Sequence, residues 1–184
     1  MAQLSGRVPL SVVMSVYNGE RYLGLAIESV LRQTYSDFEF IIVNDGSSDR
    51  TAEILWEYAR SDKRIEILTN EENKGLTSSL NFGIQHARGS VIARQDADDL
   101  SIEDRFKEQM AILETNHEIV LVSCDIEFID EQGSLLVIHK ASQFETILPQ
   151  LLAIYNCIGG HGQTMFRKAT WERIGGFDSS FKFA

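Results

Sequence analysis

SVIARQDADDL, residues 90–100, joins a β-branched run to an acidic turn. Side chains two residues apart in an extended segment project to the same side, so Asp96 and Asp98 can direct their carboxylates at one point beyond a strand. Like charges so close raise each other's pKa unless a cation or hydrogen-bond donors intervene. A hard divalent cation takes oxygen ligands and leaves positions for substrate phosphates. The stretch therefore fits a Mg²⁺ or Mn²⁺ site for a diphosphate; the alternative is a solvated loop that caps a helix starting near Ser101.

Composition and charge limit the classes to which the protein can belong. Its 184 residues, 43% hydrophobic and 24% charged, suit one globular domain with a substantial core. Seventeen Lys and Arg against 27 Asp and Glu give a net charge of −10 without a basic block, which argues against nucleic-acid binding. Cys124 and Cys157 lack the spacing of a zinc site or a disulfide framework, and such sparse cysteines fit a reducing cytoplasm.

Nothing in the sequence indicates a membrane span. No apolar run reaches the roughly 18 residues that a span needs, and the segment from Met1 to Arg7 lacks the apolar core of a signal peptide. We therefore expect a cytoplasmic protein, for which peripheral association with the inner face of the membrane stays open.

Strands are expected to alternate with helices through the first hundred residues. This alternation is typical of a doubly wound α/β sheet, mostly parallel, with right-handed crossovers. Apolar runs and helical periodicity place the elements. The expected strands are 10–16, 38–43, 65–68 and 90–93, and the expected helices run from Glu20 to near Thr34, over 51–60 with Asp49 as N-cap, and over 76–87.

Three polar turns follow strands of this predicted sheet, at residues 17–20, 44–49 and 95–99. In doubly wound sheets, ligands lie outside the carboxyl ends of the strands, so these turns should converge on one crevice. The sequence has neither GxGxxG after the first strand nor a GxxxxGK[ST] loop. A metal ion on the acidic turn would then be the means of holding phosphate.

The sequence of the second half of the chain predicts a smaller portion in which the strands are antiparallel. A hairpin-like turn at residues 130–134 separates two apolar runs, and Gly175-Gly176 marks the end of a last helix. The expected helices are 102–116, 144–154 and 168–174, the expected strands are 119–124, 126–129, 135–138 and 163–167, and residues 159–162 are expected to form a loop.

Six segments stand in a characteristic order, and we list them before naming what they resemble. They are PLSVVMSVYN (9–18) with Glu20, Tyr22 and Leu23; SVLRQTY (29–35); NDGSSD (44–49); NKG (73–75); ARQDADD (93–99); and GGFD (175–178). In combination they resemble the nucleotide-sugar glycosyltransferases of family 2, which have the GT-A fold. The resemblance covers nearly the whole chain and implies one GT-A domain over residues 1–184, with a nucleotide-binding half at 1–100 and a partial acceptor half at 101–184.

The resemblance also implies an activity. It is inverting transfer of a sugar from a nucleotide diphosphate donor, a UDP-sugar above others, to a hydroxyl of a saccharide or lipid-linked acceptor in the synthesis of cell-surface polysaccharide. Asp96 and Asp98 are similar to the family's DxD pair, with Asp98 the direct ligand of Mn²⁺ or Mg²⁺ and Asp96 bridging metal and ribose. The nucleotide contacts that it implies are Val16, Tyr17, Asn18, Glu20, Asp45, Gly75, Gln95 and Asp96.

For several of these residues a structural interpretation stays open. Asp45 could stabilise an Asx-type turn, and Glu20 could be a favourable charge in the first turn of a helix. Asp99 is a second ligand or a helix cap, and Lys74 is a nucleotide contact or a solvated lysine. His161 is a contact of the acceptor or diphosphate, or a structural histidine. Trp171 is expected in the core, and the two cysteines as small buried hydrophobes.

The catalytic base is not assigned within the chain. In relatives an acidic pair that supplies the base follows Gly-Gly-Phe-Asp, here residues 175–178, and we expect that pair just after Ala184. Asp178 belongs to the glycine-rich turn itself. The sequence is therefore expected to be a truncated N-terminal catalytic-domain fragment that binds donor and transfers sugar poorly.

Three readings from other classes compete with this one. A nucleotidyltransferase shares α/β topology and acidic metal sites, but it usually carries a basic glycine-rich loop near the first strand. A donor-binding, catalytically impaired module is the second alternative. A phosphoacceptor domain of the response-regulator kind is the third, and the long antiparallel C-terminal portion speaks against it.

Overall fold

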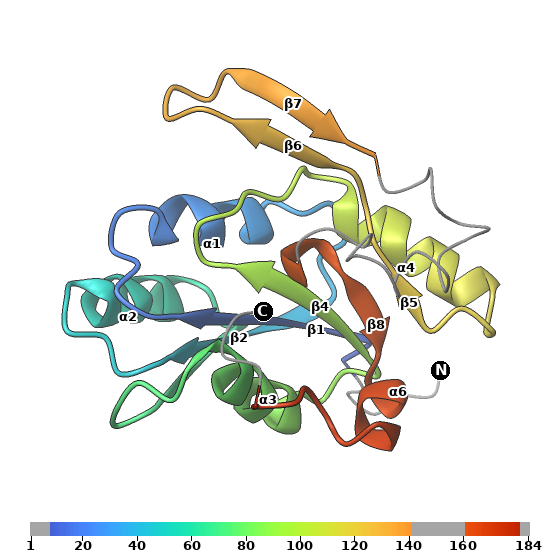
Figure 1. The fold of residues 1–184 in the computed structure, drawn as a ribbon, viewed down its shortest axis with the longest axis horizontal. Helices are drawn as coiled ribbons and strands as arrows, with labels where there is room; N and C mark the ends of the chain where they lie inside the picture. Colours follow the sequence, from blue (N-terminus) through green and yellow to red (C-terminus); the bar gives the residue numbers. More distant parts are fainter. Residues whose placement is uncertain (1–7, 141–160, 181–184) are drawn as a thin grey trace.

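β1 (Leu10–Val16) lies inside a six-stranded sheet, hydrogen-bonded to a parallel neighbour on each side (Figure 1). The computed structural model describes residues 8–140 and 161–180. Within them, a second sheet has two strands, β6 (Ile126–Ile129) and β7 (Leu135–His139). The six strands of the main sheet are, in spatial order, β3 (Ile65–Thr69), β2 (Phe38–Asn44), β1, β4 (Val91–Asp96), β8 (Met165–Arg167) and β5 (Leu121–Val122).

Helices cover both faces of the main sheet. One face carries α1 (Leu23–Leu31), α2 (Thr51–Ser61) and α4 (Arg105–Thr115), and the other carries α3 (Leu76–His86) and α6 (Lys168–Arg173). A 3₁₀ turn, η2 (His161–Gln163), precedes β8. This arrangement confirms the predicted α/β class with a mostly parallel sheet and a smaller antiparallel portion.

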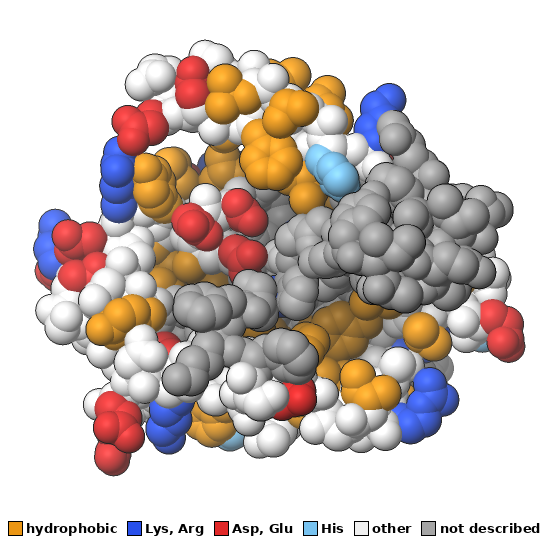
Figure 2. All heavy atoms as spheres, in the orientation of Figure 1, with side chains coloured by type: hydrophobic (Ala, Val, Ile, Leu, Met, Phe, Trp, Pro, Cys, Tyr) orange, Lys and Arg blue, Asp and Glu red, His pale blue; other side chains and the backbone are white. Residues whose placement is uncertain are grey.

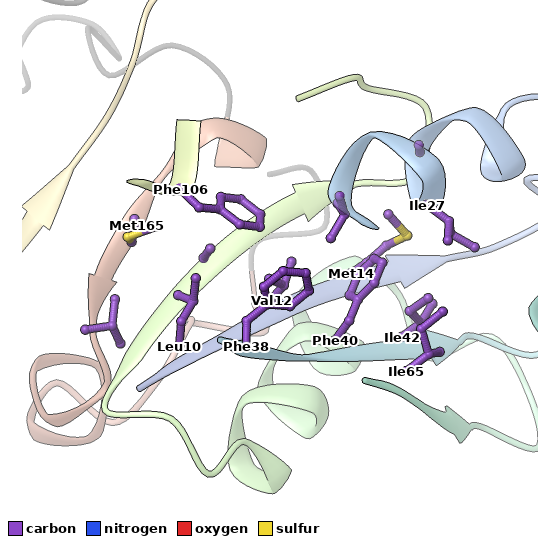
Figure 3. Packing of buried hydrophobic residues seen from close by; sticks show 14 of the residues in the cluster. Leu10, Val12, Met14, Ile27, Phe38, Phe40, Ile42, Ile65, Phe106 and Met165 are labelled. Atoms are coloured by element: carbon purple, nitrogen blue, oxygen red, sulfur yellow. The ribbon is translucent and has the colours of Figure 1, made fainter. Parts of the chain in front are cut away.

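The core lies on both sides of the sheet because the central strands are buried on both faces. Alternate residues of β1 point to opposite sides, so Val12 and Met14 join the α1 and α4 side while Val13 joins the α3 side. Figure 3 shows the first of these clusters, in which Phe38 and Phe106 meet edge to face with ring centroids 5.8 Å apart. Burial on both faces explains why these strands read as continuous apolar runs.

The chain turns antiparallel after α4. β8 lies between β4 and β5 and runs opposite to β4, with Ile92 opposite Phe166. The last helix ends as predicted, because Gly175 and Gly176 both have positive φ and the Gly176 N–H donates to the carbonyl of Trp171 at 3.0 Å. Trp171 is buried against the α3 side of the sheet, which confirms it as a core residue.

Two helices begin later than predicted, each for a physical reason. α1 begins at Leu23, and the backbone from Glu20 to Tyr22 forms a turn instead, because the Glu20 N–H donates to Asp49 Oδ2 at 3.1 Å. α4 begins at Arg105, and the preceding segment is held by a residue just after α1: the Ile102 carbonyl accepts from Gln33 Nε2 at 2.6 Å.

Other differences concern the second half. β5 has only two residues, where a strand over 119–124 is predicted. Residues 161–163 form a 3₁₀ turn, and Cys124 is only partly buried, with its Sγ 3.8 Å from the Gln163 carbonyl. The predicted helix at 144–154, Cys157 and the start of the loop at 159–160 lie outside the described residues. In the part of the chain that the structure describes, no helix has the length and apolarity to cross a membrane.

Candidate active site

A cleft opens where the carboxyl ends of β1 and β4 lie side by side. The chain builds β2 and β3 on one side of β1 and then crosses to place β4 on the other, so this is the point at which the strand order reverses. Ligands of doubly wound sheets bind at such a point. The cleft has a volume of about 550 Å³. It is lined by Ser15, Val16, Tyr17, Asn18, Gly19, Arg21, Tyr22, Leu76, Asp96, Ala97 and Asp98.

The turn after β1 is fixed by the loop after β2. Asn18 has a left-handed backbone with φ 50°, and its Oδ1 accepts from the Ser48 N–H at 2.9 Å. The Asn18 N–H in turn donates to Ser47 Oγ at 3.0 Å. These contacts hold Tyr17 at the cleft with half of its side chain exposed, as a face on which a planar ligand could stack.

Glu20 does not line the cleft. Its Oε2 accepts from the Arg50 N–H at 3.0 Å, while its own N–H donates to Asp49 Oδ2. Asp49 Oδ1 accepts from the Thr51 N–H, so both carboxylates satisfy backbone donors at the start of α2. The interpretation of Glu20 as a charge in the first turn of its own helix is wrong, because α1 begins three residues later.

Asp45 is buried and carries hydrogen bonds from the loop that precedes α3. Its carboxylate accepts from Asn70 Nδ2 at 2.7 Å and from the N–H groups of Lys74 and Gly75 at 2.9 Å each. Asn70 Nδ2 also donates to Ser79 Oγ. Neither Asp45 nor Gly75 lines the cleft, although Leu76, the residue after Gly75, does. In this structure Asp45 therefore positions the 70–75 loop, which borders the cleft.

The acidic turn sits at the end of β4 with an arginine beneath it. Asp96 Oδ1 accepts from Arg94 at 2.8 Å, and the Arg94 side chain is only 2% exposed. Burial raises the pKa of Asp96 above its usual 3.8, and the neighbouring charge of Asp98 adds to this, while Arg94 opposes it. Burial and the charges of Asp96 and Asp98 also raise the pKa of Asp99. The turn thus holds three carboxylates close together, and two of them are harder to ionise than usual, chiefly because they are buried.

Gln95 does not line the cleft, and its side chain is instead bonded to the backbone of the acidic turn. Its Nε2 donates to the carbonyls of Asp96 and Asp99, at 3.1 and 2.9 Å. Its Oε1 accepts from Ser101 Oγ at 2.6 Å and from Arg105 at 3.0 Å. Sequence reasoning missed Arg105. The available signal was its place one residue before Phe106 and four before Gln109, on a helix face that the apolar periodicity assigns to the core.

η2 lies against the acidic turn. A Cβ added to Gly162 would stand 2.6 Å from Asp96 Oδ2 and 3.2 Å from Asp99 Oδ2, so only a glycine allows this approach. The adjacent backbone of His161 is therefore brought to the side of the carboxylates, and the structure places that residue in η2. Figure 2 shows acidic side chains gathered over the loop that follows β4, below the apolar side chains of the β6–β7 hairpin.

The donor set fits a hard cation that is completed by substrate. Asp96 and Asp98 line the same cleft. Residues 8–140 and 161–180 contain no cluster of three or more His, Cys, Asp or Glu side chains arranged to hold a metal. Mg²⁺ is commonly held by one or two carboxylates together with waters and substrate phosphates. Two carboxylates that line one cleft match that pattern.

Comparison with protein families decides where the chain belongs. Residues 11–175 match the model described as glycosyl transferase family 2. The chain belongs to this family. An uncharacterized glycosyltransferase of Methanocaldococcus jannaschii is 42% identical over 138 residues, which are 74% of this chain and 48% of that protein. The O-antigen biosynthesis glycosyltransferase WbnJ of Escherichia coli is 33% identical over 173 residues, which are 94% of this chain and 66% of WbnJ. The family 2 chain thus spans about half to two-thirds of the length of these relatives.

Solved structures resemble the family 2 chain in fold. TarS 1–349 of S. aureus, in complex with UDP, superposes with a TM-score of 0.76 at 20% identity over 96% of this chain and 52% of that one. The mannosyltransferase PcManGT of Pyrobaculum calidifontis, in complex with GDP-Man and Mn²⁺, gives 0.72 at 20% identity over 95% of this chain and 49% of that one. These likenesses confirm the GT-A fold.

Proposed function

We propose that the chain binds a nucleotide diphosphate sugar in the cleft between β1 and β4 and transfers the sugar, with inversion, to an acceptor hydroxyl in surface-polysaccharide synthesis. The observation that carries the proposal is the cleft itself, which joins a half-exposed tyrosine at the end of β1 to two carboxylates at the end of β4. The groups of a nucleotide diphosphate follow the same arrangement, because a planar base stands at one end and a diphosphate, which binds a metal ion, at the other. Membership of family 2 and the O-antigen relative support the reaction class.

Different residues at the cleft would contact different parts of the donor. Tyr17 offers a ring face to the base, and its neighbours Val16 and Asn18 also line the cleft. Asp45 acts at one remove, by fixing the 70–75 loop that carries Leu76 into the cleft. UDP is the donor nucleotide that we favour, and a structure of the same fold has been solved in complex with UDP.

Asp98 and Asp96 would hold the divalent cation, Mn²⁺ or Mg²⁺, at the diphosphate end. When bound, that ion neutralises charge that builds on the departing diphosphate. Asp98 is exposed at the cleft, whereas Asp96 shares one oxygen with Arg94, so we assign the direct bond to Asp98. Arg94 keeps Asp96 oriented toward the cleft, and η2 covers the far side of that carboxylate. An arrangement fixed before binding needs little reorganisation when the donor arrives.

Calorimetric titration of UDP tests the donor site. We expect binding in the presence of Mn²⁺ that is lost with a chelator and in Asp98→Ala. Asp37→Ala is the matched control, since Asp37 precedes the amino end of β2, whereas the cleft lies at the carboxyl ends of β1 and β4, and it should leave binding unchanged. A folded protein that binds none of UDP, GDP and dTDP with metal would refute the proposal. Release of UDP from a UDP-sugar in the presence of saccharide acceptors then tests the transfer step.

A further inference from the structure

Arg105 is a buried cation whose hydrogen bonds all go to neutral groups. Its guanidinium donates to Ser101 Oγ at 2.7 Å, to Gln95 Oε1 at 3.0 Å, to the Arg94 carbonyl at 2.8 Å and to Gln109 Oε1 at 3.2 Å. Within the described residues it forms no ion pair. A buried charge without a carboxylate partner is costly, so its presence calls for a compensating role. Burial lowers the pKa of Arg105 to about 10, which leaves it charged at neutral pH.

One hydrogen-bond path from Arg105 leads through Gln95 to the acidic turn. Two donors, Arg105 and Ser101, converge on Gln95 Oε1, and this forces the amide nitrogen of Gln95 toward the turn. That nitrogen donates to the carbonyls of Asp96 and Asp99. The orientation of Gln95, and with it the shape of the turn, therefore depends on the guanidinium.

A second hydrogen-bond path leads from Arg105 through Gln109 to η2. Gln109 Oε1 accepts from Arg105, and Gln109 Nε2 donates to the Gln163 carbonyl at 2.8 Å. Gln163 adjoins Gly162, which packs against the carboxylates of Asp96 and Asp99. One guanidinium thus orients two amides, of which one is bonded to the backbone of the acidic turn and the other to the backbone of η2.

We propose that Arg105 is a positioning residue of the donor site, which sets the acidic turn and η2 relative to each other so that Asp96 and Asp98 present their carboxylates to a metal-bound diphosphate. Its charge also lies close enough to Asp96 and Asp99 to offset their mutual repulsion. A lysine would retain the charge but lacks the planar fork that reaches four acceptors. The effect on nucleotide affinity rests on the proposed function, whereas the holding of the two turns does not.

Arg167 provides a matched control. Its guanidinium also donates to neutral carbonyls, those of Leu113, Asn116 and Ile119, and it too joins α4 to the sheet. It lies opposite Val91, at the other end of β4 from the acidic turn. Arg167→Lys should therefore destabilise the fold much as Arg105→Lys does, without reaching the cleft.

Hydrogen exchange of the backbone amides tests the positioning itself. In Arg105→Lys we expect exchange of residues 95–101 and 161–164 to become about tenfold faster, the loss expected when local opening breaks one or two net hydrogen bonds. Gln109→Leu should accelerate only the 161–164 segment, and Arg167→Lys should accelerate neither. Wild-type exchange at both segments in a folded Arg105→Lys protein would overturn the proposal.

Titration of UDP with Mn²⁺ tests the consequence for the site. Loss of a residue that orients metal ligands typically weakens binding roughly 10- to 100-fold, and we expect this range for Arg105→Lys and a larger loss for Arg105→Met. Arg167→Lys should bind within about twofold of the wild type, as expected of a distant, independent site. Equal affinity in Arg105→Lys and wild type would overturn the inference. A wild-type protein that binds no nucleotide would instead refute the proposed function, and the exchange measurement would still decide whether Arg105 holds the two turns.

Discussion

Gly162 lies directly against Asp96: a methyl group at Gly162 would stand 2.6 Å from Asp96 Oδ2 and 2.9 Å from its Cγ. The contact joins a turn from the second half of the chain to the carboxylate at the end of β4. Asp96 has little freedom to withdraw, because its other oxygen is bonded to the buried Arg94. The geometry of the acidic turn therefore depends on a glycine that lies 66 residues away in the sequence.

Gly162→Ala should displace the Asp96 carboxylate and weaken metal-dependent nucleotide binding. We expect a loss of roughly tenfold in the affinity for UDP with Mn²⁺, and a loss of about 1–2 kcal/mol in the free energy of unfolding from the crowding. Calorimetry and urea unfolding measure the two effects. Gly133→Ala is the control: its φ of +80° makes alanine strained, but nothing crowds it, so stability should fall without a change in affinity. Unchanged affinity in Gly162→Ala would show that Asp96 can move without loss.

The sequence was sufficient to predict the layout of residues 10–96. Apolar runs such as 10–16 and 38–43 predict strands buried on both faces, and the helical periodicity between them leaves a parallel sheet as the only simple arrangement. The convergence of Tyr17 and Asp96 on one cleft follows, because the carboxyl ends of parallel strands share an edge of the sheet. Local pattern and global topology agree here.

The contacts beneath the cleft could not be predicted in the same way. The insertion of β8 between β4 and β5 is a long-range pairing that leaves no local period in the sequence. Arg105 stands beside the apolar positions of α4 in the sequence, but its hydrogen bonds to Gln95, Ser101 and Arg94 depend on the packing of the helix against the sheet. The donors to Asp45 could not be predicted either, because the loop that supplies them, residues 70–75, has no periodic pattern.

Asp45→Asn should loosen the loop that precedes α3. The amide cannot accept from all three of the donors that the carboxylate holds, and its nitrogen would face Asn70 Nδ2 or a backbone N–H. We expect a loss of about 2–3 kcal/mol in the free energy of unfolding, and faster hydrogen exchange at Lys74 and Gly75. Asp130→Asn is the control, since Asp130 also accepts from two backbone amides, of Gln132 and Ser134, but in an exposed turn. If both variants lost the same free energy of unfolding relative to wild type, the burial of Asp45 would not add to its contribution to stability.

The lowered pKa of Glu39 predicts that the stability of the protein depends on pH. Burial alone would raise the pKa of Glu39, but hydrogen bonds from Ser11 and Arg88 outweigh it, and the pKa lies below its usual 4.5. Because the folded-state pKa is lowered, this contribution to stability is present above about pH 4.5 and is lost as the pH falls through the folded-state pKa. Glu39→Gln should cost about 2 kcal/mol at pH 7, and the gap to wild type in urea unfolding should shrink at acid pH.

The control for Glu39 is an ion pair on the surface. Glu53 pairs with Arg50 at 3.0 Å, but both side chains are more than half exposed. Exposed pairs contribute little, so Glu53→Gln should stay within about 0.5 kcal/mol of wild type at both pH values. A gap for Glu39→Gln that is equally large at pH 7 and in acid would mean that the lost packing, and not the charge, is responsible.

Asp99→Asn should stabilise the metal-free protein. Burial and the charges of Asp96 and Asp98 raise the pKa of Asp99, so its ionised form is disfavoured in the folded state and removal of the charge relieves that cost at pH 7. Because Asp99 is still in contact with solvent, which screens its charge, we expect an increase in Tm of only about 2 °C. Asp104→Asn, five residues along, should have the opposite sign, because the Thr34 hydroxyl and Lys107 hold the pKa of Asp104 below its usual value. The two shifts can be measured by thermal unfolding with a chelator present. A lower Tm for Asp99→Asn would contradict this, because it would mean that the ionised Asp99 carboxylate is not disfavoured in the folded, metal-free protein.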